Sequence, residues 1–211
     1  ATAVALFGMG CASTEPAFVS DGLVAYYPFN DNAKDESGNG NDGNVNGKVI
    51  YGVDRHGSPL RTGIFGEGYV AVDKPKGLSP INTISCWVLI PNSEDRNGYI
   101  VSLGEEADVN NNWLEIIDGK YIKAGSTTSQ HFDTKWIIPE GNWFHVVTTY
   151  NGKSRSLYIN GVIDGITREM GGRDPIGLYV GGSDRYPVKG SIDDVRIYNR
   201  ALSAEEEKPS T

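Results

Sequence analysis

The sequence predicts an all-β protein built as a two-sheet antiparallel sandwich. Short runs rich in aromatic and β-branched residues alternate with turn residues, and no stretch with helical periodicity is longer than two turns. Asn-Gly or Asp-Gly pairs at 118–119, 151–152 and 160–161 separate apolar runs. Such pairs favour two-residue hairpin turns, because both residues tolerate a positive φ. A chain of 211 residues is long enough for one large domain of this kind.

Each expected strand is a short apolar or aromatic run bounded by turn residues. These runs are Gly22–Phe29, Lys48–Tyr51, Gly63–Phe65, Tyr69–Val72, Thr83–Ile90, Tyr99–Leu103, Trp113–Ile117, Tyr121–Ala124, Trp143–Tyr150, Arg155–Ile159, Val162–Thr167, Leu178–Val180 and Ser191–Tyr198. Trp143–Tyr150 is apolar on both faces, which predicts a central place in its sheet. Ser203 and Glu206 have the spacing of a capping box, so one short helical turn is expected there.

The first residues are interpreted as a processing segment. Residues 1–20 are assigned to a signal-peptide remnant and tail, 21–207 to the folded domain and 208–211 to a C-terminal tail. Gly10-Cys11 followed by polar residues resembles a bacterial lipoprotein cleavage site, although Gly8 stands where a leucine is usual. We therefore expect secretion or anchoring at the bacterial cell surface, with Cys11 as the candidate lipidation site.

Charge and cysteine content exclude some classes of protein. The formal charge of −8 and the absence of a Lys/Arg cluster argue against a nucleic-acid partner. Two cysteines are too few for a disulfide scaffold, and Cys86 lies in an apolar run where a cysteine packs as a small hydrophobe.

The run Gly190–Leu202, near the end of the chain, contains an acidic residue that needs explanation. Strict alternation places Val195 and Ile197 on one face and puts Asp193 on the same side. An inward carboxylate requires a partner, and a metal ion is one candidate. Asp193 at a solvated rim or capping a turn is the other interpretation that the alternation leaves open.

Six segments in order resemble the laminin-G-like, concanavalin A-like jelly-roll domains of bacterial secreted proteins. The segments are GLVAYYPFN, DESGNGNDG, ISCWV, NWFHVVTTYNGKSRSLYINGV, LYVGG and GSIDDVRIYNRALSAEE, and the resemblance covers Asp21 to Glu207. It implies that the first and last strands are neighbours. It also implies a structural calcium ion, with ligands from Asp35, Asn39, Asn41 and Asp193. Such oxygen donors suit Ca²⁺. Asp42 stands where the family often has histidine.

Catalytic motifs of related folds are absent or incomplete in this sequence. No E-x-D-x-E strand occurs, and the acidic group Glu105-Glu106-Ala107-Asp108 reads as a solvated loop. The segment YIKAG at 121–125, with Gln130 and His131, resembles part of an alginate-lyase strand but lacks its second tyrosine. The histidines, His56, His131 and His145, form no metal-binding motif, and His145 is expected to pack within its strand.

These observations favour a non-catalytic recognition module that binds a glycan or an extracellular protein, braced by calcium. Weak candidates for ligand binding are Trp113, Arg185 and Tyr186, since they lie in or beside loops, whereas Trp87 and Trp143 are expected in the core. The alternatives are a glycoside hydrolase or polysaccharide lyase on the same fold, and a structural adhesin or spacer domain.

Overall fold

The computed structural model describes residues 19–91, 97–104, 112–127, 130–168 and 174–209. The described residues form thirteen strands joined by antiparallel pairing. They are β1 (Leu23–Tyr27), β2 (Asn44–Gly52), β3 (Thr62–Asp73), β4 (Asn82–Leu89), β5 (Gly98–Leu103), β6 (Asn112–Ile117), β7 (Tyr121–Thr127), β8 (Gln130–Asp133), β9 (Trp143–Tyr150), β10 (Ser154–Ile159), β11 (Val162–Arg168), β12 (Gly177–Val180) and β13 (Gly190–Tyr198). No helix among these residues is long and apolar enough to cross a membrane.

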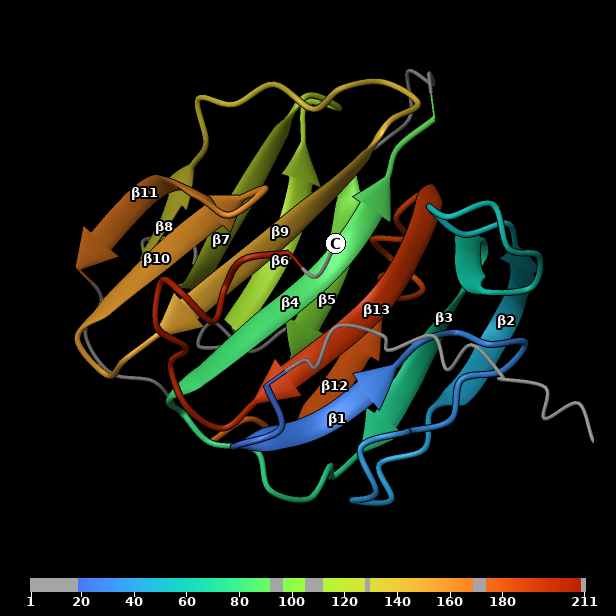
Figure 1. Ribbon diagram of the computed structural model, residues 1–211, viewed down its shortest axis with the longest axis horizontal. Helices are drawn as coiled ribbons and strands as arrows, with labels where there is room; N and C mark the ends of the chain where they lie inside the picture. The colour runs from blue at the N-terminus through green and yellow to red at the C-terminus, as the bar shows by residue number, and fades with distance from the viewer. Residues whose placement is uncertain (1–18, 92–96, 105–111, 128–129, 169–173, 210–211) are drawn as a thin grey trace, which may run out of the picture.

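The strands make two layers, as Figure 1 shows. The front layer has the order β11-β10-β9-β4-β13, with β1 paired to β13. The back layer has the order β3-β12-β5-β6-β7-β8, with β2 paired to β3. The predicted two-layer antiparallel sandwich is confirmed, and so are the pairing of the first strand with the last and the central place of β9, between β4 and β10.

Strand β3 belongs to both layers, where the sequence predicted two separate strands. Its residues Gly63–Phe65 pair with β13 of the front layer. Its residues Val70–Asp73 pair with β12 of the back layer. The glycine-rich stretch between them, Gly66-Glu67-Gly68, reads as a break in the sequence but is continuous strand here. The pairing of Gly47 with Gly68 explains the second glycine, because a Cβ there would lie 2.4 Å from the Lys48 nitrogen.

The core lies between the layers and is built from the inward residues of both. The fully buried side chains include Ile84, Phe144 and Leu157 from the front layer. Those from the back layer include Leu114 and Ile122. Cys86 is also fully buried, and burial raises the pKa of its thiol, which confirms its prediction as a packed hydrophobe.

The expected positions of two tryptophans are wrong. Trp87 and Trp143 are both partly exposed, because Val88 and Phe144, their neighbours in sequence, take the inward positions. Successive residues of a strand point to opposite faces, so these tryptophans lie on the outer face of the front layer. Their apolar flanks in the sequence suggested burial on both faces.

The chain ends in a single turn after Leu202, close to the predicted capping box. The Glu206 carboxylate accepts from the Ser203 amide at 2.8 Å and from its hydroxyl at 2.9 Å. The Glu207 amide donates to the Ser203 carbonyl at 3.2 Å, which closes one helical turn. This turn lies beside the β10–β11 hairpin, where a Cβ at Gly161 would be 3.1 Å from Pro209.

Candidate functional site

The acidic pair at the start of β13 has an arginine partner. Arg55 Nη1 donates to Asp193 Oδ2 at 2.9 Å, and its Nη2 donates to Asp194 Oδ2 at 2.6 Å. Asp194 also accepts from the Tyr26 hydroxyl at 2.6 Å and from Arg196 at 3.1 Å. One guanidinium therefore joins the loop between β2 and β3 to the closing strand of the sheet.

A bulge explains why the predicted alternation is wrong at Asp193. The register of β13 with β4 shifts between Asp193 and Arg196, and Asp194 has a φ of 49°. Ile192 and Val195 are both in the core, so two residues rather than one separate consecutive inward positions. Asp193 instead pairs with Trp87 and shares its outer face, where the Arg55 guanidinium lies 4.8 Å from the Trp87 ring.

The pKa values of the two carboxyl groups, Asp193 and Asp194, are shifted in opposite directions. Burial raises the pKa of Asp193 to about 7, and the neighbouring Asp194 charge adds to the rise. Burial alone would also raise the pKa of Asp194, but the charge of Arg196 and the hydroxyl of Tyr26 hold it below its usual value. The geometry makes Asp194 the main ionised partner of the two arginines.

The loop after β1 is organised around Asp35. Its carboxylate accepts three backbone amides, from Tyr26, Ser37 and Asn41, each at 2.9 Å. Burial alone would raise the pKa of Asp35, but the Ser37 hydroxyl and these amides lower it. The Asn39 and Asn41 side-chain amides both donate to the Val24 carbonyl, at 3.1 and 2.9 Å. The loop thus satisfies its own polar groups.

These donors do not fit a calcium ion shared by Asp35 and Asp193. Amide N–H groups point at the Asp35 oxygens, and the Arg55 guanidinium already donates to Asp193, whereas Ca²⁺ requires free oxygen donors. Asp42 Oδ1 accepts from the Asp35 amide at 2.9 Å and so helps to shape the loop. Among the described residues no group of three or more His, Cys, Asp or Glu side chains could hold a metal ion. Whether the protein binds calcium stays a prediction.

A serine–histidine pair occurs across β4 and β9, although the sequence spacing gave no sign of it. Ser85 Oγ and His145 Nε2 are 2.9 Å apart, and both residues are buried. Burial lowers the pKa of His145 to about 3, helped by the charges of Arg196 and Arg55. A histidine of this pKa is a weak general base at neutral pH. His145 is thus a packed strand residue, as predicted.

Two of the three weak ligand-binding candidates meet on the outer face of the back layer. Tyr99 contacts Trp113 edge-on with a centroid distance of 6.0 Å, and it contacts Tyr186 edge-on at 5.6 Å. Trp113 is only 8% exposed, whereas Tyr186 is 50% exposed. Tyr186 therefore presents the ring to solvent, Tyr99 contacts it edge-on, and Trp113 contacts Tyr99 in turn. We name Tyr99, Trp113 and Tyr186 the aromatic patch.

Backbone geometry fixes the position of Tyr186. The Tyr99 amide donates to the Tyr186 carbonyl at 3.2 Å, and the Tyr186 amide donates to Ser183 Oγ at 3.3 Å. Gly182 has a φ of 99°, and a Cβ there would lie 2.2 Å from the Tyr186 carbonyl oxygen. Only glycine is compatible with this close return of the loop. Arg185, the residue before Tyr186 in this loop, is exposed.

Polar side chains complete the surroundings of the aromatic patch. Lys123 Nζ lies 5.8 Å from the centre of the Trp113 ring. Glu115 is the cross-strand partner of both Tyr99 and Lys123. Tyr99 was the residue that sequence reasoning missed, because it stands at the start of an expected strand and carries no turn or loop signal. The site combines an apolar ring face with donors and acceptors, which is the combination that sugars require.

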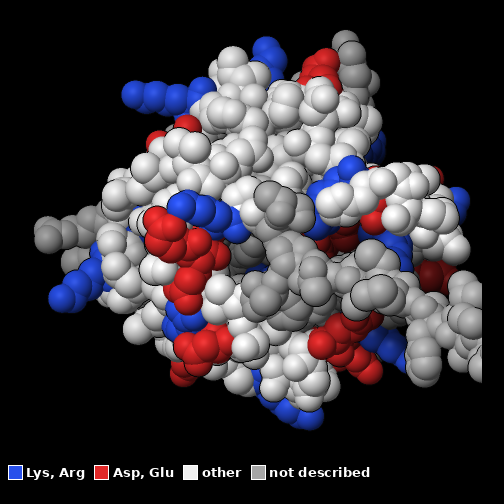
Figure 2. All heavy atoms as spheres, in the orientation of Figure 1, with Lys and Arg blue, Asp and Glu red and all other residues white. Residues whose placement is uncertain are grey.

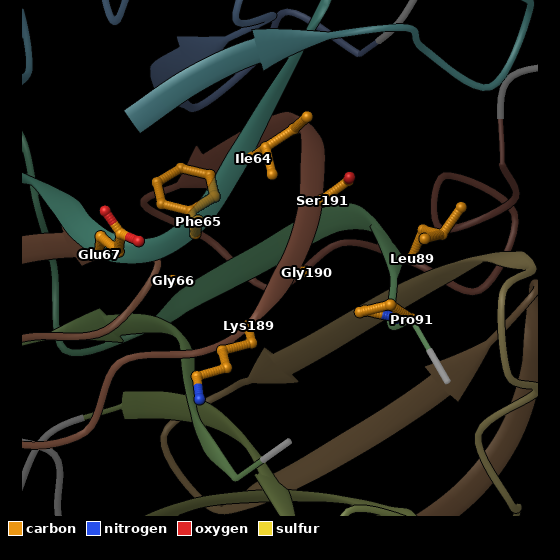
Figure 3. Close-up of a pocket in the computed structure, with 9 residues that line it drawn as sticks. All are labelled: Ile64, Phe65, Gly66, Glu67, Leu89, Pro91, Lys189, Gly190 and Ser191. Atoms are coloured by element: carbon orange, nitrogen blue, oxygen red, sulfur yellow. The ribbon is translucent and has the colours of Figure 1, made fainter. Parts of the chain in front are cut away.

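A second depression lies at the junction of β3 and β13, in the front layer. This pocket of about 340 Å³ surrounds the backbone of Gly66 and Gly190, with Glu67 and Lys189 on one side and Leu89 and Pro91 on the other (Figure 3). Ile64, Phe65 and Ser191 complete its lining. Its one aromatic residue, Phe65, is 4% exposed and faces the core. The pocket therefore offers no ring on which a sugar could stack.

Apart from Lys123, the described contacts place none of the remaining predicted residues at either site. Figure 2 shows Lys and Arg scattered over the front face, with no continuous basic surface among the described residues there. Tyr121 and Lys123 lie on β7, and Gln130 and His131 lie on the neighbouring strand β8. Glu105, Glu106, Asp108 and Cys11 lie outside the described residues.

The family of the chain follows from comparison with known proteins. The family model described as the concanavalin A-like lectin/glucanases superfamily matches residues 65–206. The chain belongs to this superfamily. No curated protein matches the sequence. The resemblance seen in the sequence is thereby confirmed.

Solved structures with similar folds include sugar- and protein-binding domains. Domain 4 of AbnA, an extracellular GH43 arabinanase from Geobacillus stearothermophilus, in complex with arabinotriose, aligns with a TM-score of 0.71 and 22% identity, over 88% of this chain and 96% of that one. The binding domain of botulinum neurotoxin DC in complex with rat synaptotagmin II aligns with a TM-score of 0.70 and 16% identity, over 90% of this chain and 51% of that one.

A third similar structure belongs to botulinum neurotoxin type C, whose cell entry depends on interaction with two ganglioside molecules. It aligns with a TM-score of 0.68 and 13% identity, over 89% of this chain and 50% of that one. This chain thus spans about half the length of the two toxin chains. At these identities the likeness shows the jelly-roll fold alone.

Proposed function

We propose that this domain is a non-catalytic recognition module that binds a carbohydrate at the aromatic patch. The observation that carries the proposal is the half-exposed Tyr186 ring, fixed by Tyr99 behind it and by a glycine-dependent loop. Sugars present apolar C–H faces to such rings and hydroxyl groups to the polar residues around them. The ring is already held in place, so little conformational entropy is lost on binding.

The similar structures support a binding role in general terms. Domain 4 of the arabinanase was solved with arabinotriose, and the type C neurotoxin interacts with gangliosides. The neurotoxin DC domain was solved with synaptotagmin II, so a protein partner is the second candidate. The aromatic patch favours the glycan, because the half-exposed Tyr186 ring is accompanied by the polar side chains Lys123 and Glu115 on the neighbouring strands.

An enzymatic function is the weaker alternative. Glycoside hydrolases of the usual mechanism require two carboxyl groups facing one another across the substrate. In the described part of the chain Glu115 is next to the aromatic patch by strand register, opposite Tyr99 and Lys123, and the exposed Asp184 stands two residues before Tyr186. The strand register does not set these two carboxyl groups across from one another. The Ser85–His145 pair lies buried on the other layer. New reducing or unsaturated ends on incubated polysaccharides would overturn the proposal of a non-catalytic module.

We also propose that the module acts outside the cell, anchored through Cys11. The support is the sequence pattern at Gly10-Cys11. Expression of the natural gene in its host, followed by fractionation and labelling with a fatty-acid analogue, tests this. Label on the parent but not on Cys11→Ser supports the anchor, and label on neither protein refutes it.

A glycan array followed by titration calorimetry tests the binding function. The parent should bind at least one glycan class, and Tyr186→Ala should weaken that binding about tenfold or more, the scale of one lost aromatic contact. Tyr158→Ala is the matched control, since it removes a tyrosine ring from β10 in the other layer. Absence of binding to every glycan on the array would refute the glycan proposal. Equal affinity of Tyr186→Ala and the parent would refute the proposed site.

A further inference from the structure

A second pair of aromatic rings lies on the same outer face as the aromatic patch. Tyr69 and Tyr179 have a centroid distance of 6.3 Å and come from the neighbouring strands β3 and β12. Val70, which follows Tyr69, and Leu178, which precedes Tyr179, belong to the core. The tyrosines therefore point away from the core, toward the outside of the back layer.

Strand register places this pair in line with the aromatic patch. Tyr179 is opposite Ser102 of β5, and Ser102 is opposite Trp113 of β6. Cross-strand partners point to the same face, so the three side chains form one row across the sheet. Neighbouring strands are about 4.8 Å apart, which puts the backbone positions of Tyr179 and Trp113 about 10 Å from one another.

The residue in the middle of this row is small. Ser102 carries only a hydroxymethyl group between two large aromatic side chains, and its hydroxyl donates to the Gly104 carbonyl at 3.4 Å. Tyr179 itself leans along its own strand, since a Cβ at Gly177 would be 2.9 Å from its ring. The row therefore has an aromatic residue at each end and a small residue in its middle.

We infer that the ligand is a linear glycan chain of several units, lying over β12 and β5 from the Tyr69–Tyr179 pair to Tyr186. This inference rests on the proposed function and adds the size class of its ligand. Tyr179 is opposite Ser102, and Tyr99, which contacts Tyr186, stands three residues before Ser102 on β5. Three residues of a strand span about 10 Å, which exceeds a single sugar ring. Two separated stacking positions favour a chain over a terminal sugar, because each additional contact is made without a further loss of translational freedom.

The inference is tested by the dependence of affinity on chain length. The probes are xylo-, cello- and arabino-oligosaccharides of one to six units, with any further class that the glycan array reveals, each titrated by calorimetry. We expect affinity to rise by about tenfold or more between the shortest binding oligomer and the longest. Tyr179→Ala should remove that rise, so that the variant binds the longest oligomer little better than the shortest.

Two further variants separate a binding role for Tyr179 from a structural one. Tyr179→Phe keeps the ring and should keep the chain-length dependence, whereas Tyr69→Ala should weaken it. The melting temperature of each variant shows whether the fold is intact. If Tyr179→Ala does not fold, the chain-length dependence of Tyr69→Ala compared with that of Tyr179→Phe still tests the inference.

The outcomes distinguish the inference from the function on which it rests. Affinity that is independent of chain length, or an unchanged dependence in the Tyr179→Ala and Tyr69→Ala variants, overturns the inference and leaves Tyr186 as a site for a single sugar. Tyr186→Ala that binds every oligomer as the parent does overturns the proposed site. No binding to any glycan overturns both.

Discussion

Glu207 should make the stability of this protein fall as the pH rises from about 4.5 to about 8, and Glu207→Gln should remove the effect. The residue is 1% exposed, and its carboxylate oxygens have no hydrogen bond of ordinary geometry among the described residues, although the Tyr158 hydroxyl is near enough to affect the carboxyl group. Burial raises its pKa from 4.5 to about 8, and the nearby Tyr158 hydroxyl limits the rise. At a pH between these two pKa values the folded protein holds a proton on Glu207 that the unfolded chain has released.

The direction and size of the effect follow from that difference. The folded state binds more protons than the unfolded state between pH 4.5 and about pH 8, so stability falls as pH rises through this interval. At about 1.4 kcal/mol per unit, the pKa change from 4.5 to about 8 sets an upper limit of about 5 kcal/mol. The terminal turn can open to water at a lower free energy than global unfolding. We therefore expect about 2 kcal/mol.

Denaturant unfolding of the parent and Glu207→Gln at pH 5 and pH 9 measures this difference. The two proteins should differ by less than about 1 kcal/mol at pH 5, and the variant should be more stable by about 2 kcal/mol at pH 9. Asp193 also titrates in this range, but it does so in both proteins, so its effect cancels in the comparison. Glu205→Gln is the matched control, because Glu205 is exposed and its charge stays in water. Parallel pH profiles for the parent and Glu207→Gln would refute the reasoning.

Two further predictions concern the residues that sequence analysis linked to calcium. Arg55→Met should lower the free energy of unfolding by about 3 kcal/mol, because it leaves Asp193 and Asp194 buried without their shared partner. Arg61→Met is the control, since Arg61 is exposed and its loss should change the free energy of unfolding little. An equal loss in both variants would contradict the role of the ion pair. Excess EDTA should leave the melting temperature unchanged, since backbone amides already satisfy Asp35; a fall that added calcium reverses would restore the predicted ion.

The fold could be predicted from the sequence because turn chemistry and apolar runs determine it locally. Asn160-Gly161 shows this, since both residues have positive φ in the hairpin between β10 and β11. The missed strand, β8, has the sequence Gln-His-Phe-Asp, which is too short and polar to show an alternating pattern. Its pairing with β7 provides what its own sequence lacks.

The candidate sites were less predictable, because their decisive contacts join distant parts of the chain. Arg55 and Asp193 are 138 residues apart, and a loop arginine gives no sign of the strand it will reach. The bulge at Asp194 also reverses the face of Asp193, and an acidic residue with positive φ is not visible in a periodic pattern. Trp113 and Tyr186 were found by their loop positions, but Tyr99 between them was not.

Both ends of the described chain belong to the front layer. The Asn199 amide donates to the Gly22 carbonyl at 2.9 Å, so the start of β1 and the end of β13 lie side by side. From there the chain runs on to Pro209, beside Gly161 in the β10–β11 hairpin of the same layer. The aromatic patch lies on the outside of the opposite layer, so an attachment made through the residues before β1 or after β13 would act on the front layer and leave the patch uncovered.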